Sequence, residues 1–369
     1  MNKIHFCKRC VVSSLRPRIS LNDEGICNAC VNTENKENID WSERKKSFLK
    51  IIKKFKKNNG DYDCVVPSSG GKDSAIVAHK LKYEFGMNPL TVTWSPLRYT
   101  EIGYENLLRF SDSGFPIMFG KANGQVLGRL TREAMITMGD PFQPFIYGQV
   151  NFPLQIANKL KIKLIFDGEN GEEEYGGNKK IKKKGFSHKD SIKYWFSNYN
   201  INFWLQKGFS KKELKPFMSP SIKEIEKTRI ERHFWSYYFK WSPQNHYYYS
   251  ARNTNFKPNF LRNEGTYSKY ASLDDKFDGF HFYFMFLKFG IGRATSDACQ
   301  EIRNKQITRQ EGVSLVKKYD GEFPKKYFNE FLEFCSLTDD QFEKICDKWR
   351  MSQAWTKKNN KWVRKAIVE

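Results

Sequence analysis

The sequence predicts an α/β protein with a parallel sheet, an N-terminal cysteine-containing module and a mainly helical C-terminal region. Three observations support this prediction. Short apolar segments alternate with amphipathic ones before residue 167, two CxxC pairs lie in the first 35 residues, and helical patterns with charged faces continue from about residue 295. For a chain of 369 residues we expect three parts, namely 1–35, 36–180 and 181–369.

The composition describes a folded and strongly basic protein. Hydrophobic residues make up 39% and aromatic residues 16%, and 63 Lys and Arg against 41 Asp and Glu give a formal charge of +22. This charge favours phosphate-rich partners such as nucleotides, nucleotide sugars, RNA or an anionic membrane face, although a solvated lysine-rich surface also explains part of it. The first residues, MNKIHFCKRC, contain no apolar signal segment. We therefore expect a cytoplasmic protein.

The most apolar stretch, residues 277–292, is too short to span a bilayer, and Asp278, His281 and Lys288 interrupt it. We expect a buried helix there and no membrane span anywhere in the chain.

The two CxxC pairs predict a metal site. Two knuckles that each present two thiolates are what tetrahedral zinc requires, and the segment LNDEGIC predicts a hairpin turn leading to the second pair. A redox dithiol is the alternative, but two pairs would then be superfluous. His5 lies close by and is left out because four sulfurs complete the coordination shell. The expected zinc ligands are Cys7, Cys10, Cys27 and Cys30.

The remaining cysteines are scattered without paired spacing, which favours free thiols over a disulfide framework in a cytosolic chain. They are Cys64, Cys299, Cys335 and Cys346.

The next segment predicts an amphipathic helix followed by an α/β pattern. Phe48, Ile51, Ile52 and Phe55 share one face of a helix over 40–56, with lysines opposite. Strands are expected at 63–67, 89–94, 115–120 and 163–167, and helices at 74–86, 103–112 and 150–160. Short strands that alternate with helices imply a parallel sheet with right-handed crossovers. The basic stretch 178–193 is interpreted as a mobile loop or a boundary, and an aromatic-rich region follows it.

Residues 65–74, VVPSSGGKDS, predict an anion site. A buried strand, small residues and a helix place free backbone amides at a helix N-terminus, where Gly70 and Gly71 permit close approach and Lys72 adds a charge. Asp73 is unusual in an anion site and suggests a bridging Mg²⁺ or helix capping. The pattern is not the GxxxxGK[ST] loop of kinases and GTPases. The residues expected to hold the anion are Ser68, Ser69, Gly70, Gly71, Lys72, Asp73 and Ser74.

SGGKDS after a buried strand resembles the PP-loop of the ATP pyrophosphatases, the adenine nucleotide α-hydrolase-like proteins with a Rossmann-like sheet. The resemblance implies that the loop grips the pyrophosphate of ATP while AMP moves to a substrate oxygen. It also implies ATP and Mg²⁺ as cofactors and catalytic roles for Ser69, Lys72 and Asp73. Further nucleotide neighbours are expected at the ends of the strands and where the fold returns to the same crevice: Thr93, Trp94, Gly148, Gly168 and Glu169.

An acidic cluster follows the predicted strand at 163–167. One or more of its carboxylates could hold Mg²⁺, and a solvated acidic loop is an equally good interpretation. The cluster consists of Glu169, Glu172, Glu173 and Glu174.

Two enzymatic functions are consistent with these motifs. The first is tRNA thiolation or another tRNA modification, because some thiolases combine an N-terminal CxxC…CxxC zinc module with this loop and the charge of +22 suits RNA. Sulfur transfer usually needs additional cysteines, however, and the remaining ones lie in a strand or in a helical region. A non-catalytic ATP sensor or RNA-binding protein is a third class, which would bind ATP without releasing AMP or pyrophosphate.

The second reading rests on a resemblance along nearly the whole chain. KRC…CNAC, SSGGKDS, GENGEEEYGG at 168–177, GTYSKYASLDDKFDGFHFY at 265–283 and KFGIGRATSDACQEIRNKQITRQEG at 288–312 resemble the N-acetyl sugar amidotransferases of bacterial O-antigen, lipopolysaccharide and related surface-glycan synthesis. The resemblance implies a carbon–nitrogen ligase that adenylates the acetamido group of a nucleotide-activated sugar, with a UDP-sugar favoured. Ammonia then displaces AMP and leaves an acetamidino group.

Several C-terminal residues suit such a substrate. Arginines could clamp a diphosphate or a sugar carboxylate, although ion pairs with Asp297 or Glu301 explain them equally well, and aspartates could bind sugar hydroxyls or Mg²⁺. The candidate substrate residues are Asp274, Asp275, Arg293, Arg303 and Arg309.

An aromatic segment could supply a surface that stacks on a uracil, although core packing explains any single ring better. Its rings are Tyr237, Tyr238 and Trp241.

The ammonia requires a source. The chain contains no recognisable Cys–His–Glu arrangement of a glutaminase, so we expect a separate glutaminase subunit. The resemblance points to a partner pair akin to the glutaminase and cyclase of histidine biosynthesis. Neither a DNA partner nor a membrane span is expected.

Overall fold

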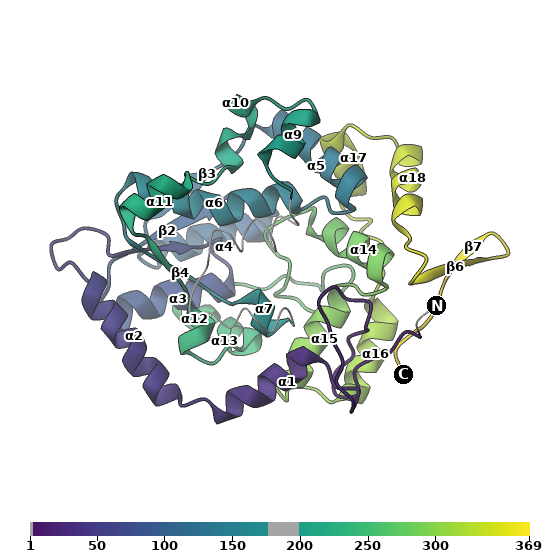
Figure 1. Ribbon diagram of the computed structural model, residues 1–369, viewed down its shortest axis with the longest axis horizontal. Coiled ribbons are helices and arrows are strands. Elements are labelled where there is room, and N and C mark those ends of the chain that lie inside the picture. The colour runs from purple at the N-terminus through teal and green to yellow at the C-terminus, as the bar shows by residue number, and fades with distance from the viewer. Residues whose placement is uncertain (1–2, 176–198) are drawn as a thin grey trace.

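The computed structural model describes residues 3–175 and 199–369, with only the backbone described at 172 and 173 (Figure 1). The predicted basic break at 178–193 lies outside the described residues. In the described part of the chain no helix is both long enough and apolar enough to cross a membrane.

A five-stranded parallel sheet in the order β3-β2-β1-β4-β5 forms the centre of the α/β part, which confirms the predicted fold class. Its strands are β1 (Cys64–Pro67), β2 (Pro89–Trp94), β3 (Ile117–Gly120), β4 (Leu164–Asp167) and β5 (Glu231–Phe234). The helices between its first four strands are α3 (Lys72–Tyr83), α4 (Glu101–Asp112), α5 (Gly124–Met138) and α6 (Gln143–Lys159). Those predicted at 74–86 and 150–160 therefore begin earlier than expected, and α5 was not predicted.

Alternate residues of the central strands pack on opposite faces of the sheet, as strand geometry requires. Val66 and Phe166 face a cluster that includes α3 and Phe48 of α2 (Trp41–Phe55). Val65 and Ile165 face Leu154 and its neighbours on α6. Helices thus cover both faces, and the polar loops are left at the strand ends (Figure 1).

The fifth strand lies beyond residue 180, so the boundary predicted there divides the sheet. β5 pairs with β4 through Phe166↔His233 and Asp167↔Phe234. Its sequence, ERHF, lacks the apolar run of a central strand because it is an edge strand, and only Phe234 is buried. The aromatic segment after β5 returns to the sheet as α12 (Trp235–Tyr238), which packs on α2, and α13 (Pro243–Asn253), which packs on α3.

A second core is shared by α5, α6 and three helices of the C-terminal region, α14 (Asp278–Phe289), α17 (Phe328–Cys335) and α18 (Asp339–Trp349). The expected buried helix at 277–292 is α14, whose Phe280 and Phe284 are fully buried. The other helices of the C-terminal region are α15 (Arg293–Arg303) and α16 (Arg309–Tyr319). An antiparallel hairpin that was not predicted follows α18, with strands β6 (Trp355–Lys358) and β7 (Lys361–Arg364).

Short helices complete the described chain. They are α1 (Asn28–Asn35), η1 (Lys36–Asn38), α7 (Gly171–Glu174), α9 (Ile201–Gln206), α10 (Lys211–Leu214), η3 (Lys215–Phe217) and α11 (Ile222–Thr228).

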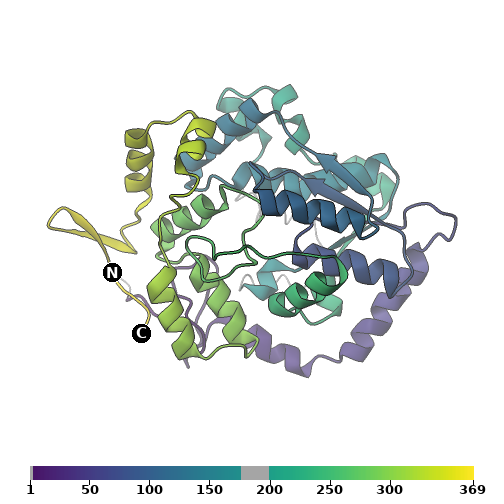
Figure 2. The same ribbon diagram turned by 180° about the vertical axis from the view of Figure 1, so that it is seen from behind.

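The N-terminal cysteine module packs on α15 and α16, far away in the sequence. Its cysteines share a buried cluster with Ala298, Cys299, Val313 and Val316. Both ribbon views show the first residues beside these helices and the two chain ends in the same part of the molecule (Figures 1 and 2). The expected hairpin turn is present, because Leu21 and Cys27 form an antiparallel bridge.

Candidate functional site

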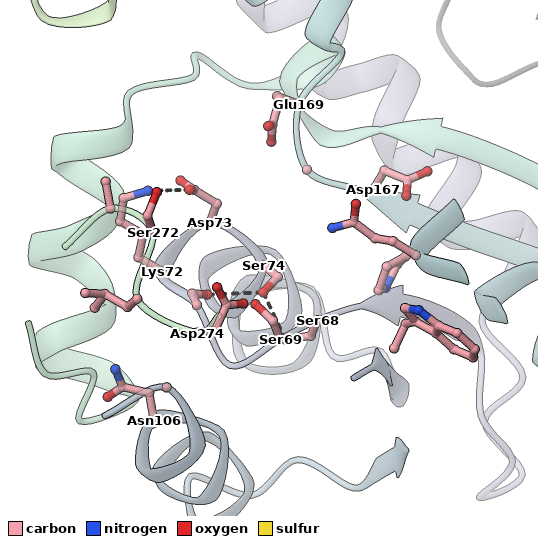
Figure 3. Close-up of a pocket in the computed structure, with 18 of the residues that line it drawn as sticks. Ser68, Ser69, Lys72, Asp73, Ser74, Asn106, Asp167, Glu169, Ser272 and Asp274 are labelled. Atoms are coloured by element: carbon pink, nitrogen blue, oxygen red, sulfur yellow. Dashed lines mark hydrogen bonds and ion pairs between the residues drawn. The ribbon is translucent and has the colours of Figure 1, made fainter. Parts of the chain in front are cut away.

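A cavity of about 350 Å³ opens at the carboxyl ends of β1 and β4. Open parallel sheets bind ligands where the strand order reverses, and here the chain leaves β1 toward β2 on one side while β4 lies on the other. Its walls include the loop after β1, residues 167–169 at the end of β4, and residues 270–274 of the C-terminal region (Figure 3). Residues of α4 and α6 also contribute to the lining.

The loop after β1 is held by its own hydroxyl and backbone groups. The Ser68 amide donates to Val92 O (2.9 Å), and its hydroxyl lies 3.0 Å from the Ser74 hydroxyl. Ser74 in turn donates to Gly71 O (3.1 Å), and the Thr93 hydroxyl donates to Ser68 O. These bonds fix the course of the loop and leave the first amides of α3 without intrahelical partners, as at any helix N-terminus.

Gly70 is required by the geometry of this loop. Its φ of +78° lies in the left-handed region, and a Cβ atom built on it would lie 2.6 Å from the Cα of Leu107. Only glycine combines this backbone conformation with such a close approach to α4. The sequence assigned Gly70 to the anion site, and the structure places it at the bend of the loop rather than on the cavity wall.

Lys72 and Asp73 begin α3 at the cavity. Lys72 is buried and ion-pairs with Asp73. From α13, His246 Nδ1 lies 2.8 Å from Asp73 Oδ1, and the Ser250 hydroxyl donates to Lys72 O (2.9 Å). Burial alone would raise the pKa of Asp73, but the Lys72 ammonium and the His246 hydrogen bond hold it below its usual value.

His246 and Ser250 are contacts that the sequence analysis missed. They stand four residues apart and therefore share one face of α13. Two polar residues at this spacing within the aromatic run HYYYSARN were the available signal.

A second carboxylate, Glu169, faces the cavity from the end of β4 (Figure 3). Burial, with the negative charge of Asp73 added, raises the pKa of Glu169 to about 7. A divalent cation between these two carboxylates would favour the charged form of both, and carboxylate oxygens are the ligands that Mg²⁺ prefers. Asp73 and Glu169 are therefore the residues that fit a Mg²⁺ ion at this site.

The C-terminal wall brings Asp274 and Arg293 to the same cavity. Burial and then the charge of Asp278 raise the pKa of Asp274, and the neighbouring Ser69 side chain opposes this shift. Arg293 pairs with Asp297 through Nε at 2.9 Å, which is the ion pair that the sequence offered as an alternative. The guanidinium nevertheless lines the cavity.

Of the predicted nucleotide neighbours, Trp94, Gly168 and Glu169 line the cavity, while Thr93 and Gly148 lie behind its wall. A Cβ on Gly148 would lie 1.9 Å from Trp94 Cε2, so this glycine makes room for the indole. The Trp94 Nε1 atom is buried without a hydrogen-bond partner in the described part of the chain. An N–H group in this state favours a ligand that accepts its hydrogen bond.

Three of the predicted substrate residues do not line this cavity. Asp275 accepts backbone N–H groups of Leu97 and Phe277, so its carboxylate joins chain segments outside this cavity. Arg303 donates to Glu174 O (2.9 Å) beside the cysteine module, and Arg309 donates to Glu369 O (2.6 Å) as well as to the module. Both arginines hold tertiary structure because α15 and α16 pack on the module.

The aromatic rings proposed for stacking on a base also serve packing. Tyr238 and Trp241 are buried in the core on the α3 side of the sheet, and Tyr237 packs under the Arg44 guanidinium, 3.4 Å from the ring centre. None of the three lines the cavity.

The four predicted zinc ligands do come together. The Sγ atoms of Cys7, Cys10, Cys27 and Cys30 all lie within 4.8 Å of one another, and all four residues are buried. Backbone N–H groups support the sulfurs, among them Cys27 N to Cys7 Sγ (3.2 Å) and Cys30 N to Cys27 Sγ (3.4 Å). Four buried thiols at this separation fit a tetrahedral zinc ion.

The chain is similar over part of its length to a curated protein, and its fold is similar to that of solved structures. A protein of Methanocaldococcus jannaschii, described as uncharacterized protein MJ1599, is 39% identical over 88 residues, or 23% of this chain. The match spans only 31% of that relative's length. The NH3-dependent NAD synthetase from Campylobacter jejuni, in complex with nitrate, is similar over 50% of this chain and 99% of its own, with 17% identity and a TM-score of 0.30.

A family match covers the segment that forms the C-terminal wall. Residues 264–368 match the family described as LPS biosynthesis protein WbpG-like, C-terminal domain. This segment includes Asp274 and Arg293 of the cavity as well as α14 to α18. This part of the chain is therefore similar to the C-terminal domain of WbpG-like lipopolysaccharide biosynthesis proteins, in line with the resemblance to surface-glycan enzymes.

Proposed function

We propose that the protein is an ATP-dependent amidotransferase of bacterial surface-polysaccharide synthesis. The acetamido oxygen of a nucleotide-activated N-acetyl sugar attacks the α-phosphorus of ATP, and pyrophosphate leaves. Ammonia then adds to the activated carbon, and AMP departs with the former acetamido oxygen. The product is an acetamidino group, and the net products besides it are AMP and pyrophosphate.

One observation carries this proposal: the loop and the lipopolysaccharide-family segment share a single cavity. Lys72 and Ser74 line it from the first turn of α3, and Ser272, Asp274 and Arg293 line it from the matched residues 264–368. A phosphate-binding loop and a family-specific wall around one space suit a reaction between ATP and a second substrate.

The residues of the chain have distinct roles in this scheme. The amides at the start of α3 and the Lys72 ammonium hold the departing pyrophosphate, where they stabilise developing charge. Asp73 and Glu169 would hold a Mg²⁺ ion, which supplies charge neutralisation at the phosphates when bound. Asp274, with its raised pKa, can donate or accept a hydrogen bond at the acetamido group.

The ammonia comes, in this proposal, from a separate glutaminase subunit with a cyclase-like partner, because the sequence contains no recognisable glutaminase arrangement. The tRNA-thiolation alternative is less well supported. Among the described residues that line the cavity there is no cysteine. Cys64 is buried in β1, and Cys335 and Cys346 lie in the helical core.

The test is an assay for AMP and pyrophosphate with ATP, ammonium and either UDP-N-acetyl sugars or unmodified tRNA. We expect release to depend on the sugar. Release that depends only on tRNA would reject the proposal in favour of tRNA modification. ATP binding without turnover under any of these conditions would instead indicate a non-catalytic ATP sensor.

A further inference from the structure

The cavity of about 350 Å³ beside the loop after β1 is called the loop cavity. A second cavity adjoins it on the side of the C-terminal region. It measures about 610 Å³ and is bounded by residues 100–102, 259–264, 275–276 and 324–327. Its volume lies well inside the usual range of about 300–1,000 Å³ for small-molecule sites. A third cavity, of about 280 Å³, also reaches Arg293, but it falls below this range.

Ser272 and Arg293 line both the loop cavity and the second cavity, so the two spaces meet at these side chains. Ser272 has a φ of +55°, a strained conformation for a residue with a side chain. Its hydroxyl is buried without a hydrogen-bond partner in the described part of the chain. A strained backbone and an unsatisfied hydroxyl at this junction indicate that a bound ligand forms the missing hydrogen bond to Ser272.

The lining of the second cavity suits an aromatic anion. Phe260 is 90% exposed at its edge, which is unusual for a phenylalanine and leaves a ring face free for stacking. Lys326 forms no ion pair among the described residues, and its ammonium lies 4.9 Å from the centre of the Tyr327 ring. The carboxylate of Glu264, which also lines this cavity, already accepts the backbone N–H groups of Lys325 and Lys326.

Most of this wall belongs to the family-specific segment. Of the residues that bound the cavity, those from Glu264 through Tyr327 fall within 264–368, the part that matches the lipopolysaccharide family, and Phe260 lies just before it. The loop cavity, by contrast, has its phosphate-binding residues in the loop after β1 and the first turn of α3. A site that recognises the second substrate is expected on the family-specific side.

We infer that the second cavity binds the nucleoside diphosphate of the sugar substrate, with the base at Phe260 and the diphosphate near Lys326 and Arg293. The sugar then extends past Ser272, and its acetamido group reaches the loop cavity. This inference rests on the proposed function, to which it adds the place and the recognising residues of the second substrate.

The test measures the dissociation constants of UDP-N-acetylglucosamine and of a non-hydrolysable ATP analogue by calorimetry on the full chain. The two test variants are Phe260→Ala and Lys326→Gln. Tyr248→Ala is the control for an exposed aromatic, with 60% exposure and no place in the cavity wall. Lys318→Gln is the control for an exposed lysine over a tyrosine, since its ammonium lies 5.2 Å from the Tyr319 ring centre.

Because stacking on one base is worth roughly 1–3 kcal/mol, Phe260→Ala should weaken sugar-nucleotide binding at least about fivefold. Lys326→Gln should do the same through the lost charge, while both controls stay within twofold and all four variants keep their affinity for the ATP analogue. Unchanged sugar-nucleotide affinity in both test variants, or no binding to the unmodified protein at millimolar concentration, overturns the inference. Failure of the proposed function is a separate result, because it appears as absent sugar-dependent AMP release.

Discussion

The two sides of the loop cavity are built in opposite ways. The proposed phosphate side comes from ten consecutive residues, 65–74, and several hydrogen bonds within this segment shape the loop. The substrate side combines residues 270–274 with Arg293, and both lie some two hundred positions further along the chain. A phosphate group can be held by local backbone amides, whereas a particular sugar requires side chains that only tertiary packing assembles.

The largest effect is expected on the phosphate side. Lys72→Ala removes the buried cation from the start of α3 and should lower AMP release by on the order of 10²–10³, as for the loss of one group that stabilises a transition state. Pyrophosphate release measures this, and zinc content should stay unchanged. Lys80→Ala, further along the same helix, is the control. Turnover within threefold of the unmodified protein would exclude the proposed role of Lys72.

The cysteine module supports the substrate side, because Cys299 of α15 packs on it and α15 begins at Arg293. Cys27→Ser should abolish zinc binding at this site and lower the melting temperature by at least about 5 °C, since metal binding contributes directly to folding. Metal analysis and calorimetry check this.

Cys346→Ala is the matched control for the cysteine module, because Cys346 is buried in the helical core away from the cluster. It should keep its zinc. A Cys27→Ser protein that retains a full equivalent of zinc would contradict the four-cysteine site.

Arg293→Ala should affect the binding of the sugar and not that of ATP, so the two KM values test whether the two sides of the cavity bind different substrates. Loss of a charged hydrogen bond should raise the KM for the sugar about 10-fold or more while the KM for ATP stays within threefold. Arg309→Ala is the control, because Arg309 lies in the same segment but bonds to the cysteine module. Equal increases in both KM values would mean that Arg293 does not distinguish the substrates.

Substituting two glycines by alanine distinguishes the cost of backbone strain from the cost of a steric clash. Gly60 and Gly70 both have positive φ, +87° and +78°, but only Gly70 has a close neighbour for a Cβ atom. Gly60→Ala should cost about 1 kcal/mol of unfolding free energy, and Gly70→Ala distinctly more, with weakened ATP binding. Denaturant unfolding measures both. Equal costs would show that the approach to Leu107 does not constrain the loop.

The smallest expected effect is a dependence of stability on pH, through a contact that attaches α14 to the chain before α6. His281 of α14 lies 2.8 Å from Asp140, which precedes α6. Burial alone would lower the pKa of His281, but the Asp140 carboxylate, helped by Asp278 and opposed by Lys288, raises it above its usual value. Burial alone would raise the pKa of Asp140, and the His281 charge holds it down instead.

The sign of the pH effect follows from these two directions. The stability from His281 is fully present below the ordinary histidine pKa of about 6.5 and is lost as the pH rises through the raised value. The stability from Asp140 is present above the ordinary aspartate pKa and is lost only as the pH falls through its lowered value. Between pH 6 and pH 9 the protein should therefore lose stability that Asp140→Asn does not lose. Melting curves at both pH values check this, and parallel pH profiles would refute the coupling.

The sequence could predict the phosphate side because its signal is local. The strand 89–94 and the four cysteines are where the pattern placed them, and the loop residues other than Gly70 line the cavity. Strand alternation and ligand spacing act over short distances. The edge strand β5 was missed because ERHF carries no buried apolar run. His246 was missed because its contact with Asp73 exists only once α13 packs on α3.

The substrate side could be predicted only in part. Arg293 and Asp274 do line the cavity, but Arg303, on the same helix as Arg293, turns toward Glu174. Which arginine of a helix faces a ligand depends on what covers its other faces. Here the cysteine module packs on the end of α15, so Arg303 lies beside the module and bonds to Glu174 instead of facing the cavity. The sequence contains no local sign of that packing.

The central claim is that the oxygen of the sugar's acetamido group is transferred to AMP. Its most direct test uses a nucleotide-activated N-acetyl sugar with ¹⁸O in the acetamido carbonyl, supplied with ATP and ammonium, and mass spectrometry of the AMP formed. The account predicts one ¹⁸O atom in each AMP and none in pyrophosphate. Unlabelled AMP together with turnover of the sugar would contradict it, because the oxygen would then have left by another route.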